Sequence, residues 1–224
     1  MRNDSYLKKD ISYFINPRLD LISLMPDNLP QKVLEIGMGG GDTLVYIKQH
    51  LLASEVVGID LVELPGTNQL NPVIDKVYFM DLEKEDLPFA DDYFDVIIAG
   101  DVLEHLTDPW RVLQKLSTVL KVGGNLLVSL PNIRDVYALC PLLFKGRFTY
   151  TSQGIFDKTH MRFFCKKDMI ELLQSVRELK IELVMPIQNF GDKNYKRKLF
   201  NRFSFHLFEE FTTSQYLFRV VKTN

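Results

Sequence analysis

The amino-acid sequence predicts an α/β fold built on a largely parallel sheet, and three observations lead to it. Short apolar runs alternate with longer amphipathic runs from Val33 to Val128, which is the pattern of successive β-α-β units. A glycine-rich turn follows the first apolar run, and Asp60 and Asp81 end the next two. Because open α/β sheets bind ligands at the carboxyl ends of their strands, the sequence also predicts a ligand site at that edge.

Five strands and two helices are predicted between residues 33 and 130. The strands cover residues 33–36, 55–59, 76–80, 94–99 and 125–130. One helix is expected over 42–51 and another over 109–120, where Asp108 is a suitable N-cap and Pro109 a suitable first helical residue. Gly123 and Gly124 are expected to mark the end of the second helix.

Flanking segments complete a single domain over residues 1–224. Asn16-Pro17 predicts a helix start within an N-terminal helical segment of about residues 1–30. After the fifth strand, an apolar run at 133–148 and a polar run at 149–159 predict an inserted helix and loop within about residues 132–165. A helix over 166–179 and strands at 181–187 and 216–221 follow.

Composition narrows the class of protein. The 224 residues carry 27 Lys plus Arg and 29 Asp plus Glu, for a net charge of −2, so no global positive field favours nucleic acid. Cys140 and Cys165 have no metal-binding spacing, so neither a zinc site nor a disulfide framework is expected. With no signal-peptide core and no apolar run of membrane-spanning length, we expect a cytoplasmic protein.

The glycine turn and the two acids suit a nucleoside. Gly37, Gly39 and Gly41 allow positive φ and let a ligand lie against the main chain. Asp60 follows about twenty residues later, where a carboxylate can accept both hydroxyl hydrogens of an adenosine ribose. Asp81, just past the next strand, is placed to accept a hydrogen bond from an adenine amino group.

A dinucleotide is disfavoured as the ligand. The dinucleotide-binding fingerprint puts its third glycine where this chain has Asp42, and that carboxylate would lie where a pyrophosphate sits. Glu35, two residues before the first glycine, suits instead a ligand with a positively charged amino group. S-adenosylmethionine carries an adenosine, an ammonium, a carboxylate and a sulfonium, and it has no phosphate.

These motifs resemble those of the class I S-adenosylmethionine-dependent methyltransferases. The resemblance spans about a hundred residues and is carried by Glu35 to Gly41, Gly58 to Asp60, Asp81-Leu82, Phe94 to Leu106 and Leu120 to Asn125. Met38 departs from it, since many relatives carry a small residue or cysteine there. Residues 157–164, D-x-T-H-x-R-F-F, are similar to a segment of bacterial methyltransferases of polysaccharide and secondary-metabolite biosynthesis.

The resemblance implies a doubly wound, Rossmann-like sheet of seven strands, mostly parallel with an antiparallel last strand and with helices on both faces. It implies S-adenosyl-L-methionine as cofactor and S-adenosyl-L-homocysteine as product. It also implies a cofactor contact for each matching residue: the amino-acid end at Glu35, the glycine turn at Gly37, Gly39 and Gly41, the ribose at Asp60 with Leu61, the adenine at Asp81 and Leu82, and the methionine side at Ala99, Asp101 and His105.

The site for the methyl acceptor is predicted from the histidine residues. A hydroxyl acceptor needs a base near neutrality, and His160 lies between Asp157 and Arg162 on the inserted loop, near Tyr150, which predicts an acceptor pocket. A purely structural loop held by Asp157 and Arg162 is the equally weighted alternative. His105, beside the fourth strand, is a second catalytic candidate, although orienting the loop is its favoured role.

The predicted function is methyl transfer to a small-molecule or carbohydrate-type acceptor, most readily at oxygen. Three alternatives stay open: N- or C-methylation in quinone or secondary-metabolite synthesis, a cofactor-binding but inactive partner protein, and the disfavoured nicotinamide oxidoreductase. A basic, aromatic helix over residues 193–211 offers peripheral membrane contact, although packing between the last two strands is its favoured role. The sequence does not determine the oligomeric state.

Overall fold

A computed structural model describes residues 16–27, 31–188 and 208–224. The seven strands of its single sheet lie in the order β3-β2-β1-β4-β5-β7-β6. In chain order they are β1 Lys32–Ile36, β2 Glu55–Asp60, β3 Lys76–Phe79, β4 Phe94–Gly100, β5 Leu120–Pro131, β6 Leu179–Ile187 and β7 Gln215–Lys222.

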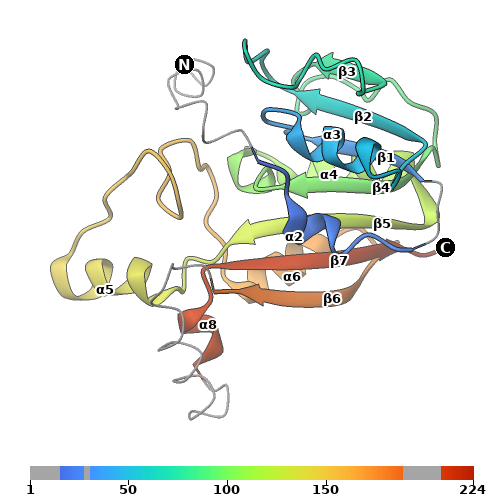
Figure 1. Ribbon diagram of the computed structural model, residues 1–224. Helices are drawn as coiled ribbons and strands as arrows, with labels where there is room; N and C mark the ends of the chain where they lie inside the picture. Colours follow the sequence, from blue (N-terminus) through green and yellow to red (C-terminus); the bar gives the residue numbers. More distant parts are fainter. Residues whose placement is uncertain (1–15, 28–30, 189–207) are drawn as a thin grey trace.

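Strands β1 to β5 pair in parallel, while β7 runs antiparallel to both of its neighbours, β5 and β6. The predicted sheet, mostly parallel with an antiparallel last strand, is confirmed. The carboxyl ends of the parallel strands therefore share the edge seen on the left of Figure 1. In this register Ile36 lies beside Ile59 and Ala99, so the turns after β1, β2 and β4 meet at that edge.

Helices cover both faces of the sheet (Figure 1). On one face α2 (Leu19–Ile22) and α3 (Asp42–Gln49) share an apolar cluster with the sheet, and on the other α4 (Pro109–Val119) and α6 (Lys166–Leu173) share a second cluster. The predicted cap of α4 is present, since the Asp108 carboxylate accepts a hydrogen bond from the Arg111 amide at 3.1 Å. Burial of these apolar faces is the main stabilising contribution.

Three boundaries differ from the prediction. Helix α6 ends at Leu173 rather than at residue 179, because the Ser175 hydroxyl donates to the Leu172 carbonyl at 2.7 Å and closes the last turn. The N-terminal helix α2 is a single turn. Gly123 and Gly124 do not end a helix: β5 already begins at Leu120, and the two glycines lie within it, where its register with β4 shifts.

The inserted segment forms the predicted helix and loop. Helix α5 (Val136–Lys145) starts at Asp135, whose carboxylate accepts from the Tyr137 amide at 2.8 Å, and it ends at Gly146, which has φ 56°. Figure 1 shows α5 extending beyond the carboxyl edge of the sheet. Most of the helix predicted over 193–211 lies outside the described residues, which here contain the short α8 (Glu209–Thr212). None of the described helices is long and apolar enough to cross a bilayer.

Candidate active site

The glycine turn after β1 packs against two neighbouring loops. Gly37, Gly39 and Gly41 all have positive φ, at 61°, 54° and 84°. A Cβ on Gly37 would lie 2.5 Å from the Val102 side chain, and one on Gly41 would lie 2.9 Å from the Asn68 carbonyl oxygen. Glycine is therefore required here by the loops after β2 and β4 as well as by backbone conformation.

Asp60, at the end of β2, is tied to this turn. Its carboxylate accepts hydrogen bonds from the Gly39 amide at 2.9 Å and from the Leu61 amide at 2.7 Å. Burial raises the pKa of Asp60 to about 6, although these amide donors favour the ionised form and act in the opposite direction. The side chain is consequently fixed in place and ionised near neutral pH.

Glu35 lies deeper, within β1 and below the glycine turn. It is 4% exposed, and burial raises its pKa to about 8 even though the Thr43 hydroxyl and the nearby Arg18 guanidinium favour ionisation. Its Oε2 atom has no hydrogen-bond partner within the described residues. A buried carboxyl oxygen in that state is a natural partner for a positively charged donor.

Asp101 follows β4 in a left-handed conformation, with φ 56°. Arg18 donates to one of its carboxylate oxygens at 2.8 Å, and the Ser129 hydroxyl and the Gln215 amide donate to the other. These partners come from the N-terminal segment, β5 and β7, so distant parts of the chain hold one acid in a strained backbone position. Such strain is a signal of a functional site.

Two cavities meet at Asp101. The first has residues from the glycine turn and from the ends of β2, β3 and β4 in its wall: Gly37, Ile59, Asp60, Leu61, Met80, Asp81, Leu82, Glu83, Asp101, Val102, His105 and Leu106. We call it the nucleoside cavity. Most of the cofactor residues predicted from the sequence line it. Asp81 also pairs with Lys84 at 2.8 Å, and Leu82 is buried.

Four predicted cofactor residues are not in this wall: Glu35, Gly39, Gly41 and Ala99. Ala99 is fully buried within β4 between Ile36 and Val128, in the core of the sheet. Glu35 is in the adjacent strand, and Gly39 contributes its amide to Asp60. Their contact with a ligand stays a prediction, whereas their role in building the edge is visible.

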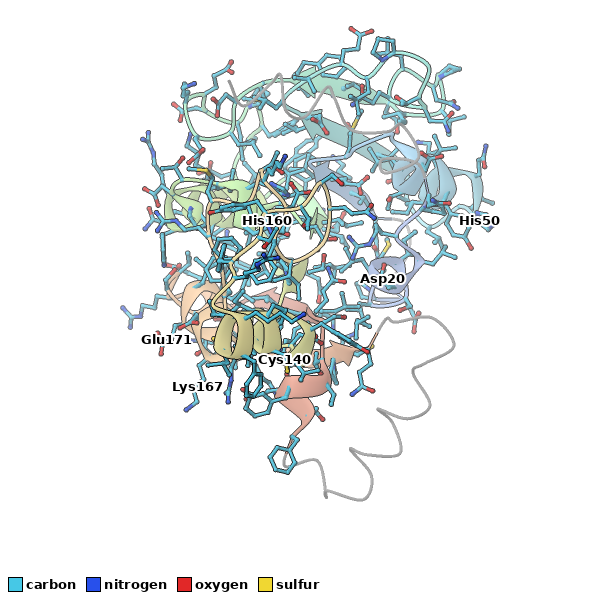
Figure 2. All side chains as sticks on the ribbon, turned by 90° about the vertical axis from the view of Figure 1, so that its left-hand side faces the viewer. Asp20, His50, Cys140, His160, Lys167 and Glu171 are labelled. Carbon is cyan, nitrogen blue, oxygen red and sulfur yellow. The ribbon has the colours of Figure 1, made fainter. Side chains whose placement is uncertain are left out.

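The second cavity has a volume of about 450 Å³, a size typical of small-molecule sites. We call it the acceptor cavity. It lies between the sheet edge and the inserted segment and is mainly apolar, with a few polar groups: Asp101, Glu104, Pro131, Tyr137, Ala138, Thr151, Gly154, Ile155, Phe156, His160, Ser214 and Gln215. Figure 2 looks onto this edge and labels His160 near its middle, with Cys140 of α5 below.

His160 is the predicted acceptor-side residue that the structure places in this wall. Its Nδ1 lies 2.9 Å from the Ile155 carbonyl oxygen, which makes Nδ1 the protonated nitrogen of the neutral ring. Its Nε2 lies 3.9 Å from Glu104 Oε1, and its ring makes an edge contact with His105 at 4.6 Å between centroids. The Nδ1 of His105 lies 3.1 Å from the Thr159 carbonyl oxygen.

Glu104 completes this group. It is 1% exposed, and neither carboxyl oxygen has a hydrogen-bond partner within the described residues. Burial, reinforced by the negative charges of Asp101 and Asp157, raises the pKa of Glu104 well above its ordinary value and so favours its neutral form. A neutral carboxyl group does not hold a neighbouring imidazole in its charged form.

The other predicted acceptor residues lie outside the cavity wall. The Asp157 carboxylate accepts from the Thr159 amide and hydroxyl, at 2.8 and 2.7 Å, and so shapes the loop. The Arg162 guanidinium donates to the Thr107 carbonyl oxygen and lies 5.3 Å from the Trp110 ring centroid. Tyr150 is 51% exposed and packs on Phe148. Asp157 and Arg162 thus each bond to another part of the loop region, at Thr159 and at Thr107.

Several polar residues around Asp101 and His160 were not assigned individually from the sequence. Arg18, Ser129 and Gln215 reach Asp101 across 83, 28 and 114 residues of sequence, so no local pattern marks them. Glu104 does lie within the recognised run before His105, and a carboxylate next to a candidate histidine is the signal that could have identified it.

The donor set around the nucleoside cavity fits a cationic, phosphate-free ligand. The carboxylates of Asp60 and Asp101 and the buried carboxyl group of Glu35 surround the glycine turn, and the nearby Arg18 already pairs with Asp101. Phosphate would be repelled there, whereas ribose hydroxyls and an ammonium would be bound. Between the two cavities, Glu104, His105 and His160 bring ligand atoms within 4.8 Å of one another, and these carboxylate and imidazole groups are donor types that a divalent cation also uses.

Comparison with known proteins agrees with this geometry. Residues 34–128 match the family described as "Methyltransferase domain". The ubiquinone/menaquinone biosynthesis C-methyltransferase UbiE of Vibrio vulnificus is 34% identical, over 44% of this chain and 40% of its own length. The sarcosine/dimethylglycine N-methyltransferase of Aphanothece halophytica is 31% identical, over 46% and 39%. The match thus spans about two fifths of these relatives' length.

Solved structures share the fold over nearly the whole chain. The S-adenosylmethionine dependent methyltransferase of Mesorhizobium loti superposes with a TM-score of 0.62 at 17% identity, covering 96% of this chain and all of that one. The likeness to this structure is one of fold. Residues 34–128 therefore match a methyltransferase domain, and the chain shares the fold of S-adenosylmethionine-dependent methyltransferases.

Proposed function

We propose that the protein transfers the methyl group of S-adenosylmethionine to a hydroxyl oxygen of a small-molecule or carbohydrate-type acceptor held in the acceptor cavity. The observation that carries the proposal is the position of Asp101, which lies in the walls of both cavities. A methyl donor on one side of Asp101 and an acceptor on the other can meet there. Methyl transfer is an in-line displacement, so holding the two reactants in contact is the main catalytic contribution.

Residues of the nucleoside cavity would hold the cofactor. Asp60 would accept the ribose hydroxyl hydrogens, since its carboxylate is already fixed by the Gly39 and Leu61 amides. Leu82 and Asp81 would border the adenine. The methionine end would lie toward Asp101 and Arg18, and the ammonium would favour ionisation of Glu35, whose pKa is about 8 without it.

His160 would take the proton of the acceptor hydroxyl. The Ile155 carbonyl fixes the proton of the neutral ring on Nδ1, which leaves the Nε2 lone pair as the basic site. Because the raised pKa of Glu104 favours its neutral form, Glu104 would not hold the imidazole in the charged form, which cannot act as a base. His105, in edge contact with His160, would position the ring rather than act on the acceptor.

The relatives favour one alternative acceptor class. UbiE is a C-methyltransferase of quinone biosynthesis, and the mainly apolar wall of the acceptor cavity would also suit an aromatic quinol. Both reactions begin by removing a hydroxyl proton when the ring is a phenol, so the same His160 would serve. The methylated atom in the isolated product distinguishes them.

The test is methyl transfer from tritium-labelled S-adenosylmethionine to a panel of sugars, lipid-linked glycans and quinols. We expect His160→Ala to lower kcat by about 10²- to 10⁴-fold, the usual contribution of a general base, with affinity for S-adenosylhomocysteine nearly unchanged. His50→Ala is the matched control, because His50 is exposed at the end of α3 and stacks on Tyr46. Loss of cofactor affinity in His160→Ala would refute its assignment.

Two further outcomes are decisive. Activity that disappears on chelation and returns with a divalent cation would show that Glu104, His105 and His160 act as metal ligands, and the base mechanism would be wrong. Binding of the cofactor with no turnover on any acceptor would support an inactive, cofactor-binding partner protein instead.

A further inference from the structure

The end of α5 and the loop that follows it form a continuous exposed surface. All residues from Leu142 to Gly154 are exposed. Large apolar side chains dominate the first part of this run: Phe144 is 82% exposed, Leu143 69%, Tyr150 51%, Phe148 40% and Leu142 39%. We call residues 142–150 the α5 tip.

Other exposed apolar side chains in the described residues are dispersed over the sequence. Leu51, at 80%, follows α3, and Leu70, at 63%, lies in the loop between β2 and β3. Single exposed apolar residues of this kind are normal on protein surfaces. Five exposed apolar side chains within nine residues, at the end of a projecting helix, form an unusual cluster. Such patches mark interaction sites.

Charge distinguishes the kind of partner. Lys145 and Arg147 lie among these apolar residues and are exposed, and neither makes an ion pair with any described carboxylate. The stretch from residue 136 to 156 contains no Asp or Glu. Aliphatic and aromatic side chains mixed with cations, and free of acids, have the chemistry of a surface that lies on anionic lipid headgroups.

The α5 tip adjoins the acceptor cavity. Tyr137 and Ala138 of α5, and Thr151, Ile155 and Phe156 of the following loop, line that cavity. Figure 1 shows this segment as the part of the described chain that extends farthest from the sheet on the carboxyl side. A surface that contacted the α5 tip would therefore lie next to the segment that forms the cavity wall.

We propose that the α5 tip docks the protein on an anionic lipid bilayer, with Leu143 and Phe144 inserted among the lipids and Lys145 and Arg147 against the headgroups. The role of this docking rests on the proposed function: it would bring an acceptor dissolved in the membrane to the acceptor cavity. A stable protein partner would need about 1,200–2,000 Å² of total buried surface, whereas the α5 tip is a narrow projection of a few side chains.

Vesicle co-sedimentation of the full chain tests the docking. The vesicles contain phosphatidylcholine alone or phosphatidylcholine with phosphatidylglycerol, and neither cofactor nor acceptor is added. We expect binding to the anionic vesicles that weakens as salt is raised. The double variant Leu143→Asp/Phe144→Asp should bind at least about tenfold more weakly, since it removes the apolar anchors and adds like charge.

Matched variants separate this surface from general stickiness. Leu51→Asp/Leu70→Asp introduces the same charges at equally exposed sites elsewhere and should bind as the parent does. Lys145→Ala/Arg147→Ala should lose the preference for anionic vesicles. All of these variants keep residues 193–211 intact, so undiminished binding by Leu143→Asp/Phe144→Asp would place the membrane contact elsewhere and overturn the proposal.

Two other results would overturn it. The first is that the parent protein binds neither kind of vesicle at low salt. The second is that the parent forms a concentration-dependent dimer which the Leu143→Asp/Phe144→Asp variant abolishes, because the α5 tip would then contact a second copy of the chain. Vesicle binding is measured without turnover, so a failure of docking is distinct from a failure of the proposed methyl transfer.

Discussion

The nucleoside cavity and the acceptor cavity share Asp101 but are built in different ways. The first is formed mainly by turns that continue directly from parallel strands, and its key acid, Asp60, is held by backbone amides close to it in the fold. The second depends on an inserted segment whose loop meets the sheet edge through bonds such as the Met161 amide to the Glu104 carbonyl oxygen, at 2.8 Å. The nucleoside cavity is preorganised by the sheet, whereas the acceptor cavity is shaped by the packing of the inserted segment on the sheet edge.

The largest expected effect is a loss of ligand affinity at the nucleoside cavity alone. Asp60→Asn keeps the shape of the side chain but removes a charged acceptor of the ribose hydroxyls. Hydrogen bonds to charged groups contribute about 1.5–3 kcal/mol, so we expect S-adenosylhomocysteine affinity to fall roughly 10- to 100-fold. Isothermal titration calorimetry measures the change.

Asp91→Asn serves as its control, since Asp91 is exposed and outside both cavities. We expect that variant to bind like the parent. Unaltered affinity in Asp60→Asn would mean that the ligand does not use this carboxylate, and the assignment of the nucleoside cavity would fail.

A second prediction concerns the acid beneath the turn. Glu35 ionises at about pH 4.5 when unfolded and at about pH 8 when folded. Between these values the folded state holds the extra proton, so the free energy of unfolding falls as pH rises. From pH 6 to pH 8 we expect a loss of about 2 kcal/mol from Glu35, with a smaller loss of the same sign from Asp60, whose pKa is about 6.

Urea unfolding across that range measures the loss, and Glu35→Gln should remove the part of the slope that comes from Glu35, because a neutral amide does not titrate; the raised pKa values of Asp60 and Glu104 leave a remaining slope. Equal slopes in the parent and Glu35→Gln would contradict the raised pKa. Bound S-adenosylmethionine should reduce the slope as well, since its ammonium would favour the ionised carboxylate.

The smallest expected effect concerns the local stability of the loop beside the acceptor cavity. Phe148 packs on Tyr150, Phe156 and Phe163 with ring centroids 5.4, 4.6 and 5.2 Å away. Aromatic pairs contribute about 0.5–1.5 kcal/mol each beyond their buried area. We expect Phe148→Ala to speed amide hydrogen exchange in residues 146–163, with little change in the sheet or in cofactor affinity.

Leu143→Ala offers a matched comparison, because it truncates an exposed apolar residue of α5 outside that aromatic cluster. It should leave exchange in the loop unchanged. Faster exchange throughout the sheet in Phe148→Ala would show that the two halves unfold as one unit, and the contrast between them would not hold.

The nucleoside cavity could be predicted from the sequence more fully than the acceptor cavity. The glycine turn, the place of Asp60 at a strand end and the five parallel strands were predicted because each depends on short-range patterns and on the rule that parallel strands end at one edge. The pattern failed at Ser175, where a side-chain hydrogen bond ends α6 although buried Val176 continues the apolar spacing. It failed again at Gly123, which lies in a strand irregularity rather than at a helix end.

The acceptor side was predicted only in part, for a physical reason. His160 does line the cavity, but whether it meets Glu104 depends on how a loop fifty residues away in sequence folds onto β4. The contacts of Asp101 with Arg18 and Gln215 have no sequence periodicity either. Periodicity reports which face of an element is buried, and it carries no information on which loop covers an edge.

Met38 and Gly58 form a pair whose consequence reaches beyond this one chain. A Cβ on Gly58 would lie 1.9 Å from the Met38 sulfur, and Met38 itself is 4% exposed. The thioether therefore occupies the volume that a side chain on β2 would need. During evolutionary drift the two positions are tied: a bulkier residue at 58 becomes acceptable only after position 38 has shrunk, so their substitution histories should be correlated and ordered in time.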